Sequence, residues 1–84
     1  MSNEFTVFNP EDIINKKAKG LEEDNYLGIV KKVEEYIITQ KIGYRRIKRV
    51  ITTFYIPKNL VDHFDSDTVY FKITKEEAKQ YKQQ

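Results

Sequence analysis

The sequence predicts a small, mainly β domain, a barrel of short strands with a short helix at its C-terminal end. Three observations support this prediction. The chain has only 84 residues, apolar and polar residues alternate over several short stretches, and turn-forming residues separate those stretches. At this length a second independent core would leave each half too small to fold unaided. We therefore assign residues 1–84 to a single domain whose core spans about residues 5–78.

The N-terminal half contains one helix start and one clear strand. Residues 9–12 read Asn-Pro-Glu-Asp, which is typical of a first helical turn, because Asn caps free N–H groups and Pro fits the first helical position. Residues 16–20 are too short and too charged to assign, whereas residues 26–33 are rich in β-branched residues and predict a strand. Gly28 inside that strand indicates a bulge or a close approach of another backbone. At residues 34–35 we favour a bend between two strands over a tight hairpin, because neither Gly nor Asn is present.

The strongest strand signal lies in the middle of the chain. Residues 50–56 are rich in Val, Ile, Thr, Phe and Tyr, and Pro57 should end the strand that they form. One face of this strand is expected to carry Val50, Thr52, Phe54 and Ile56, and the other Ile51, Thr53 and Tyr55. Leu60 and Phe64 are spaced four apart, which favours one irregular helical turn at residues 60–64.

The last third of the chain predicts a half-buried strand followed by a helix. Three side chains follow a period of two and should point inward: Val69, Phe71 and Ile73. Thr74 and Glu77 have the spacing of a capping box, in which each side chain accepts a hydrogen bond from the other residue's backbone. A short helix is therefore expected over about residues 75–82.

The composition excludes several classes of function. The chain has no Cys, so disulfides, thiolate metal sites and thiol nucleophiles are impossible. Its three glycines stand isolated, so no phosphate-cradling glycine loop exists. No apolar run is long enough to span a bilayer and no signal region is present, so we expect a cytoplasmic protein without membrane insertion. We expect no enzymatic activity and no cofactor.

His63 and its neighbouring acids form the one cluster in the sequence that suggests a metal or acid–base site. Residues 65–67 read Asp-Ser-Asp, like the start of a calcium loop, but Val69 and Tyr70 occupy the positions where such a loop needs an oxygen ligand and a glycine. The alternative is that these acids form a turn and accept hydrogen bonds from backbone N–H groups. We adopt this alternative and expect no metal.

A basic segment at residues 41–49 is the main candidate for function. The residues expected to bind a partner are Lys41, Tyr44, Arg45, Arg46, Lys48 and Arg49, together with Tyr55 on the next strand. Such a segment suits an acidic protein partner, with arginines making charge-assisted contacts and a tyrosine as anchor. It also suits RNA or DNA, through phosphate contacts and base stacking. A third interpretation is a solvated connection or projecting hairpin arm, whose charges keep a β edge from pairing with other chains.

Two parts of the chain resemble domains of the PRC-barrel superfamily, especially its small stand-alone bacterial and archaeal members. The first part is residues 12–20 (DIINKKAKG) with 27–33 (LGIVKKV), and the second is residues 55–61 (YIPKNLV) with 67–78 (DTVYFKITKEEA). The resemblance implies a compact PRC-barrel-like fold used as a docking module, with no shared catalytic residues. It also implies adaptor roles, in archaeal cell division or ribosome-associated assemblies. We therefore expect a non-enzymatic adaptor with a protein partner, self-associating as a homodimer, and keep an RNA- or DNA-binding module as the alternative.

Overall fold

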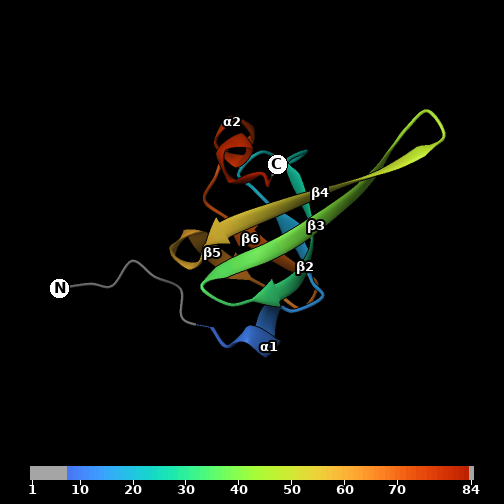
Figure 1. Ribbon diagram of the computed structural model, residues 1–84. Helices are drawn as coiled ribbons and strands as arrows, with labels where there is room; N and C mark the ends of the chain where they lie inside the picture. The colour runs from blue at the N-terminus through green and yellow to red at the C-terminus, as the bar shows by residue number, and fades with distance from the viewer. Residues whose placement is uncertain (1–7, 84) are drawn as a thin grey trace.

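The computed structural model describes residues 8–83, which form one six-stranded sheet with short helical turns packed at its ends (Figure 1). The strands are β1 (Lys17–Lys19), β2 (Tyr26–Val33), β3 (Tyr36–Arg45), β4 (Lys48–Pro57), β5 (Val61–Phe64) and β6 (Thr68–Phe71). The helical pieces are α1 (Pro10–Ile13), η1 (Lys58–Leu60), α2 (Lys75–Ala78) and η2 (Lys79–Tyr81). The prediction of a mainly β domain with a short helix near its C-terminal end is confirmed. The N-terminal limit of the predicted core, residues 5–7, lies outside the described residues.

The sheet is open, whereas the sequence favoured a barrel. Its strand order is β4-β3-β2-β1-β6-β5, so β4 and β5 are the two edge strands and do not pair with each other. The C-terminal residues instead occupy part of the edge of β4. Phe54 and Lys82 form an antiparallel bridge, and the Gln83 backbone N–H donates to the Thr53 carbonyl over 2.7 Å. Backbone groups of β4 that would pair with another strand in a closed barrel are therefore partly used by the end of the chain.

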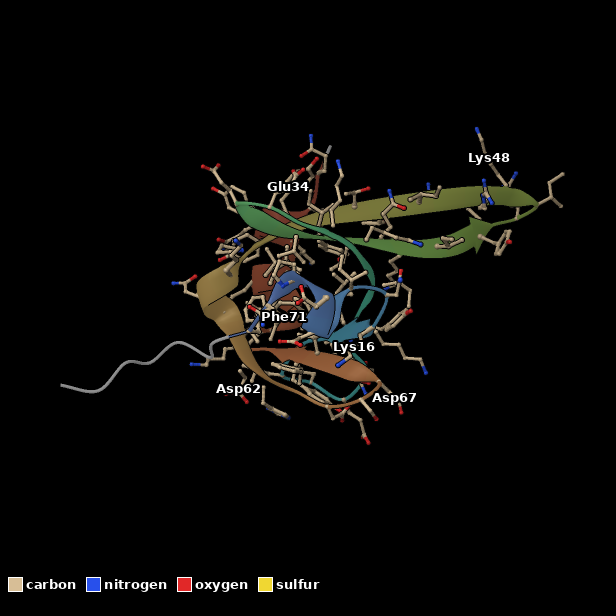
Figure 2. All side chains as sticks on the ribbon, turned by 90° about the horizontal axis from the view of Figure 1, so that it is seen from below. Lys16, Glu34, Lys48, Asp62, Asp67 and Phe71 are labelled. Atoms are coloured by element: carbon tan, nitrogen blue, oxygen red, sulfur yellow. The ribbon has the colours of Figure 1, made fainter. Side chains whose placement is uncertain are left out.

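The core lies inside the curved sheet, where the inward apolar residues of β4 meet those of β6 and Ile73 after it. Phe71 lies at its centre, as the side-chain view shows (Figure 2). The inward alternation predicted for β6 is confirmed, since Val69, Phe71 and Ile73 are all buried. On β4 the predicted face that carries Val50, Thr52, Phe54 and Ile56 is buried at Phe54 and Ile56 and exposed at Val50, which lies beyond the body of the sheet. The complete set of buried apolar residues is Ile13, Ala18, Leu27, Val30, Ile37, Phe54, Ile56, Val61, Val69, Phe71, Ile73 and Ala78.

Gly28 permits a close approach of two strands, as its position in the sequence predicted. Its φ is +97°, a region that side-chain-bearing residues rarely adopt. A Cβ atom at Gly28 would lie 2.2 Å from the Gln40 carbonyl oxygen on β3. One residue away, the Thr39 hydroxyl donates a buried hydrogen bond of 2.7 Å to the Leu27 carbonyl. Strands β2 and β3 therefore lie unusually close to each other at Gly28.

The predicted helix caps are present at both ends of the described chain. The Asn9 N–H donates to the Asp12 carboxylate over 2.8 Å, and Pro10 occupies the first helical position. At α2 the Glu77 N–H donates to the Thr74 hydroxyl over 3.1 Å, while the Thr74 N–H donates to the Glu77 carboxylate over 2.9 Å. This reciprocal pair starts the helix where the sequence predicted it.

Two local predictions are wrong. Strands β2 and β3 pair antiparallel, so residues 34–35 reverse the chain as a hairpin rather than bending it. Residues 61–64 form strand β5, whereas only residues 58–60 make a helical turn. Pairing with β6 explains the second error, because Val61 lies opposite Phe71 and is fully buried there. That long-range contact outweighs the helical spacing of Leu60 and Phe64.

Candidate interaction surface

The β3–β4 hairpin continues beyond the rest of the sheet as a projecting arm, which we define as residues 41–52 (Figures 1 and 2). Strand β2 pairs with β3 only as far as Gln40, so the arm has no third strand beside it. Its five cross-strand pairs run from Lys41 opposite Thr52 to Arg45 opposite Lys48. At about 3.4 Å per residue they make a two-stranded ribbon roughly 17 Å long. The projecting hairpin expected as one possible shape of the basic segment is confirmed.

The tip of the arm is a two-residue turn with an unusual composition. Arg46 has a φ of +61°, in the left-handed region that normally favours Gly or Asn. Ile47 beside it is 99% exposed. Lys48 follows at the start of β4, and Figure 2 shows it at the outer end of the molecule. A strained arginine and a fully exposed isoleucine do not stabilise a hairpin.

The two faces of the arm differ. The face that continues the core side of the sheet carries Lys41, Gly43 and Arg45 on β3, opposite Thr52, Val50 and Lys48 on β4. The outer face carries Ile42 opposite Ile51, and Tyr44 opposite Arg49. Ile42 is 55% exposed and Tyr44 is 73% exposed. The outer face is therefore apolar and aromatic, with a single cation near the tip, while cations dominate the inner face.

Charge is strongly segregated along the chain. Residues 41–49 hold five of the 15 basic residues and no acid, which gives a formal charge of +5. The other 75 residues hold ten basic and 13 acidic residues, so their formal charge is −3. In Figure 2, Lys48 lies far out on the arm, whereas the labelled acids Glu34, Asp62 and Asp67 lie on the body.

A pocket lies at the root of the arm, on its inner face, with a volume of about 410 Å³. The arm contributes Lys41, Gly43, Tyr44, Arg45, Val50 and Thr52. The wall opposite them comes from the loop before β2 and from the C-terminal helical turns. That wall contains Asp24, Tyr26, Lys75, Ala78, Lys79 and Lys82. Segments far apart in the sequence thus border an open hollow lined mainly by cations and apolar groups.

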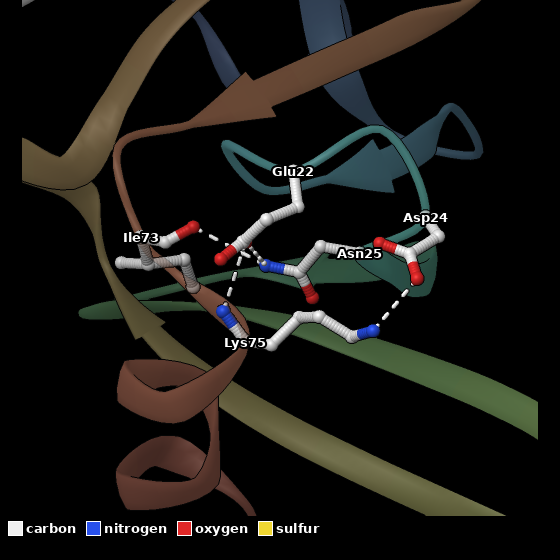
Figure 3. A network of polar contacts seen from close by, with 5 residues as sticks. All are labelled: Glu22, Asp24, Asn25, Ile73 and Lys75. Carbon is white, nitrogen blue, oxygen red and sulfur yellow. Dashed lines mark hydrogen bonds and ion pairs between the residues drawn. The ribbon is translucent and has the colours of Figure 1, made fainter.

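A polar network holds the C-terminal wall of this pocket against the loop before β2 (Figure 3). The Asn25 side-chain NH₂ donates to the Ile73 carbonyl over 3.2 Å and to the Glu22 carboxylate over 3.3 Å. The same Glu22 oxygen accepts the Lys75 backbone N–H over 3.0 Å. This network fixes the start of α2, and with it the residues that follow.

Lys75 and Asp24 form an ion pair of 2.7 Å at the rim of the pocket (Figure 3). The hydrogen bond between them lowers the pKa of Asp24 and raises the pKa of Lys75. The charge of Lys75 is therefore already matched. Among the described residues, no carboxylate forms an ion pair with Lys41, Arg45 or Lys82.

The structure separates the predicted binding residues into three groups. Lys41, Tyr44 and Arg45 line the pocket, and Arg45 is also paired with Lys48 beside the turn. Arg46, Lys48 and Arg49 lie at or near the tip. Tyr55 lies elsewhere, at the root of the outer face. Its ring meets Tyr36 edge to face with 6.5 Å between centroids, in a shallow hollow that Glu34 and Glu35 also line. Tyr55 therefore has acidic neighbours and is separate from the cations of the arm.

Sequence reasoning missed the contribution of Tyr26, Lys79 and Lys82 to the pocket. Lys82 reaches the root of the arm through its bridge to Phe54, 28 residues earlier in the chain. The sequence carries no local signal for such a contact, because its residues are ordinary for a frayed helix end.

The acids at residues 65–67 form a turn, as expected, whereas Asp62 and His63 lie on strand β5. The Asp65 carboxylate accepts the backbone N–H groups of Asp67 and Thr68, each over 2.8 Å. These hydrogen bonds lower the pKa of Asp65. The His63 ring lies 2.8 Å from the Asp62 carboxylate and stacks on Tyr70 with 4.4 Å between centroids. Within residues 8–83, no three His or acidic side chains converge as a metal site requires.

Fold and surface together define a mainly β protein with an open sheet and a cationic hairpin arm. Comparisons with protein-family models, with curated proteins and with solved structures give no match. The helices within the described residues are too short to cross a membrane.

Proposed function

We propose that this protein is a non-enzymatic adaptor that docks its arm on an acidic surface of a partner protein. The observation that carries this proposal is the arm itself, an acid-free ribbon that projects from the body and exposes apolar and cationic side chains together. Arginine next to aromatic and aliphatic side chains is the composition of the centre of a protein interface.

The tip supports a binding role over a purely protective one. Cations alone would keep the edges of the arm from pairing with other chains. Ile47 is 99% exposed, and Ile42 and Ile51 are exposed as well. These side chains add nothing to that protection, and they increase the risk of aggregation. Arg46 at positive φ costs about 1–2 kcal/mol relative to a glycine. Burial against a partner would offset both costs.

The resemblance to PRC-barrel domains agrees with this proposal, since such domains serve as docking modules. On that basis we place the adaptor in the cytoplasm, in a cell-division or ribosome-associated assembly of an archaeal type. A homodimer is part of the same proposal, and mass measurement in solution tests it.

The test is a charge reversal at the tip. A triple variant, Arg46→Glu, Lys48→Glu and Arg49→Glu, should remove the proteins that the wild type captures from lysate of its source cells, as identified by mass spectrometry. A matched control changes three exposed cations of the body, Lys17, Lys31 and Lys58, to Glu, with the same change in net charge. The proposal fails if the tip variant captures the same proteins as the wild type.

A nucleic-acid-binding module is the second candidate, and the shape of the arm favours it. The major groove of DNA is wide enough for a two-stranded ribbon, and several architectural proteins insert an apolar side chain between bases. The arm offers such a ribbon, with Ile47 at its tip between Arg46 and Lys48. Fluorescence anisotropy with labelled duplex DNA and with RNA should then show affinity that falls steeply as salt increases. The absence of any binding at low salt removes this candidate.

A further inference from the structure

We propose that the pocket at the root of the arm binds a small ligand in which an oligophosphate group is joined to an apolar or aromatic group, such as a nucleoside polyphosphate. This site lies on the inner face of the arm, and the proposed docking surface lies on the outer face and tip. The inference does not rest on the partner proposed above, although Tyr44 borders both surfaces.

The charges that line the pocket favour an anion. Five cations line the pocket, Lys41, Arg45, Lys75, Lys79 and Lys82, and Asp24 is the one carboxylate among its lining residues. Asp24 is already paired with Lys75. Lys79 lies 3.6 Å from Glu76, an exposed pair that is weak in water. The pocket thus has an excess of positive charge that nothing within the described residues neutralises.

These exposed cations border one open space, so an anion that reaches several of them gains more than one charge-assisted contact. A single carboxylate or phosphate matches one or two such cations. The pocket holds three that have no carboxylate partner, Lys41, Arg45 and Lys82, and they come from two sides of one space. An oligophosphate carries several negative charges on a short chain and matches this set.

The backbone fixes the positions from which these exposed side chains extend. Lys41 and Arg45 stand two residues either side of Gly43 on one face of β3, with cross-strand partners on β4. Lys82 is held by its bridge to Phe54, and its neighbour Gln83 is hydrogen-bonded to Thr53. Both sides of the pocket are thus attached to the same strand, β4, which preorganises the site.

The rest of the lining suits an organic group. Tyr26, Val50, Phe54 and Ala78 provide apolar surface beside the cations. A volume of about 410 Å³ lies within the range of pockets that hold small molecules. A ligand with a ring attached to its phosphates should therefore bind more tightly than inorganic phosphate chains do.

Gly43 provides the sharpest test, because it lines the pocket and a Cβ atom there would meet nothing within 4 Å. Gly43→Trp should fill the pocket and leave the fold intact, since a strand position tolerates an aromatic residue well. Ile42→Trp is the matched control, because it places the same ring on the outer face of the same strand.

The probes are ATP, tripolyphosphate and adenosine, added to the full chain while NMR follows the amide signals of Gly43 and Thr52. ATP should bind most tightly, tripolyphosphate more weakly and adenosine least. Gly43→Trp should abolish ATP binding and leave the melting temperature within a few degrees of wild type, and Ile42→Trp should bind as wild type does. Lys41→Glu and Lys82→Glu should each weaken ATP binding about tenfold or more, whereas Arg49→Glu at the tip should have little effect.

Three results would overturn the proposal. One is the absence of any signal change with all three probes at millimolar concentration. Another is wild-type ATP binding by Gly43→Trp, which would place the ligand elsewhere. The third is a uniform loss with every charge variant, including Arg49→Glu, which would show general attraction to a basic surface. Equal affinity for ATP and tripolyphosphate would contradict the proposal that the ligand carries an apolar or aromatic group. It would assign the site to inorganic phosphate chains.

Discussion

The arm and the body, which is the rest of the described chain, share strands β3 and β4. They differ in the elements that pack against these two strands. On β3, Ile37 is completely buried while Ile42, five residues later on the same strand, is 55% exposed. The backbone pairing continues unchanged between these positions, from Ile37 opposite Ile56 to Ile42 opposite Ile51. Only the body has β2 and the C-terminal turns beside it. A regular ladder of hydrogen bonds therefore shapes the arm, whereas burial stabilises the body.

The largest contrast should come from the same substitution at two glycines. Gly28→Ala in the body places a Cβ in a left-handed conformation and 2.2 Å from the Gln40 carbonyl oxygen. Strain and overpacking should together destabilise the fold by about 4 kcal/mol, enough to unfold much of the population. Gly43→Ala in the arm meets open space and should change stability by less than about 0.5 kcal/mol. Urea denaturation of both variants measures the contrast, and equal effects would contradict it.

The second contrast concerns the two isoleucines of β3. Ile37→Ala removes a fully buried side chain and should cost about 3 kcal/mol, through lost burial and the cavity left behind. Ile42→Ala removes a side chain that is mostly in water, so its cost should stay below about 1 kcal/mol. Thermal unfolding followed by circular dichroism compares the two variants. A large loss with Ile42→Ala would mean that the arm packs against something in solution, such as a second copy of the chain.

A smaller contrast should appear between two threonines. Thr39→Val removes the buried hydrogen bond from the hydroxyl to the Leu27 carbonyl and should cost about 1 kcal/mol. Thr52→Val in the arm keeps the shape and strand preference of the residue, and should change stability by less than about 0.5 kcal/mol. Denaturation midpoints of the two variants against wild type give the result.

The smallest effect should be a loss of folding stability of the body at low pH. The pKa of Asp65 is lowered from 3.8 by the backbone N–H groups of Asp67 and Thr68. The unfolded chain therefore binds the proton more readily than the folded one, so stability is present above about pH 4 and declines as the pH falls through the folded pKa. Asp65→Asn can keep an acceptor oxygen but cannot titrate, so its stability should decline less between pH 5 and about pH 2. Residues 41–49 contain no carboxylate, so their charge should stay constant over this range.

The features that were predictable from the sequence depend on neighbouring residues. The alternation that buries Val69 and Phe71 and the cap formed by Thr74 and Glu77 are short-range patterns, and both are present. Gly28 was identified in the same way, because glycine inside a strand signals a local need for space.

The features that were missed depend on contacts between distant segments. Strand β1 contains a single apolar residue, Ala18, and exists because it pairs with both β2 and β6, with Lys17 opposite Thr68. Contacts between distant segments also explain why part of the candidate site was missed. The cations of residues 41–49 were visible as a run, but Lys82 joins them only through its bridge to Phe54, which no local pattern encodes.

The segregation of charge has a consequence for how this protein meets other molecules. With +5 on residues 41–49 and −3 on the remainder, the molecule has an electric dipole along the arm. In the field of a negatively charged target, that dipole orients the tip forward before contact, which raises the rate of productive encounters and lowers the rate with positively charged surfaces. This preference for negatively charged targets acts on the association rate, and it weakens as added salt shortens the range of the electric field.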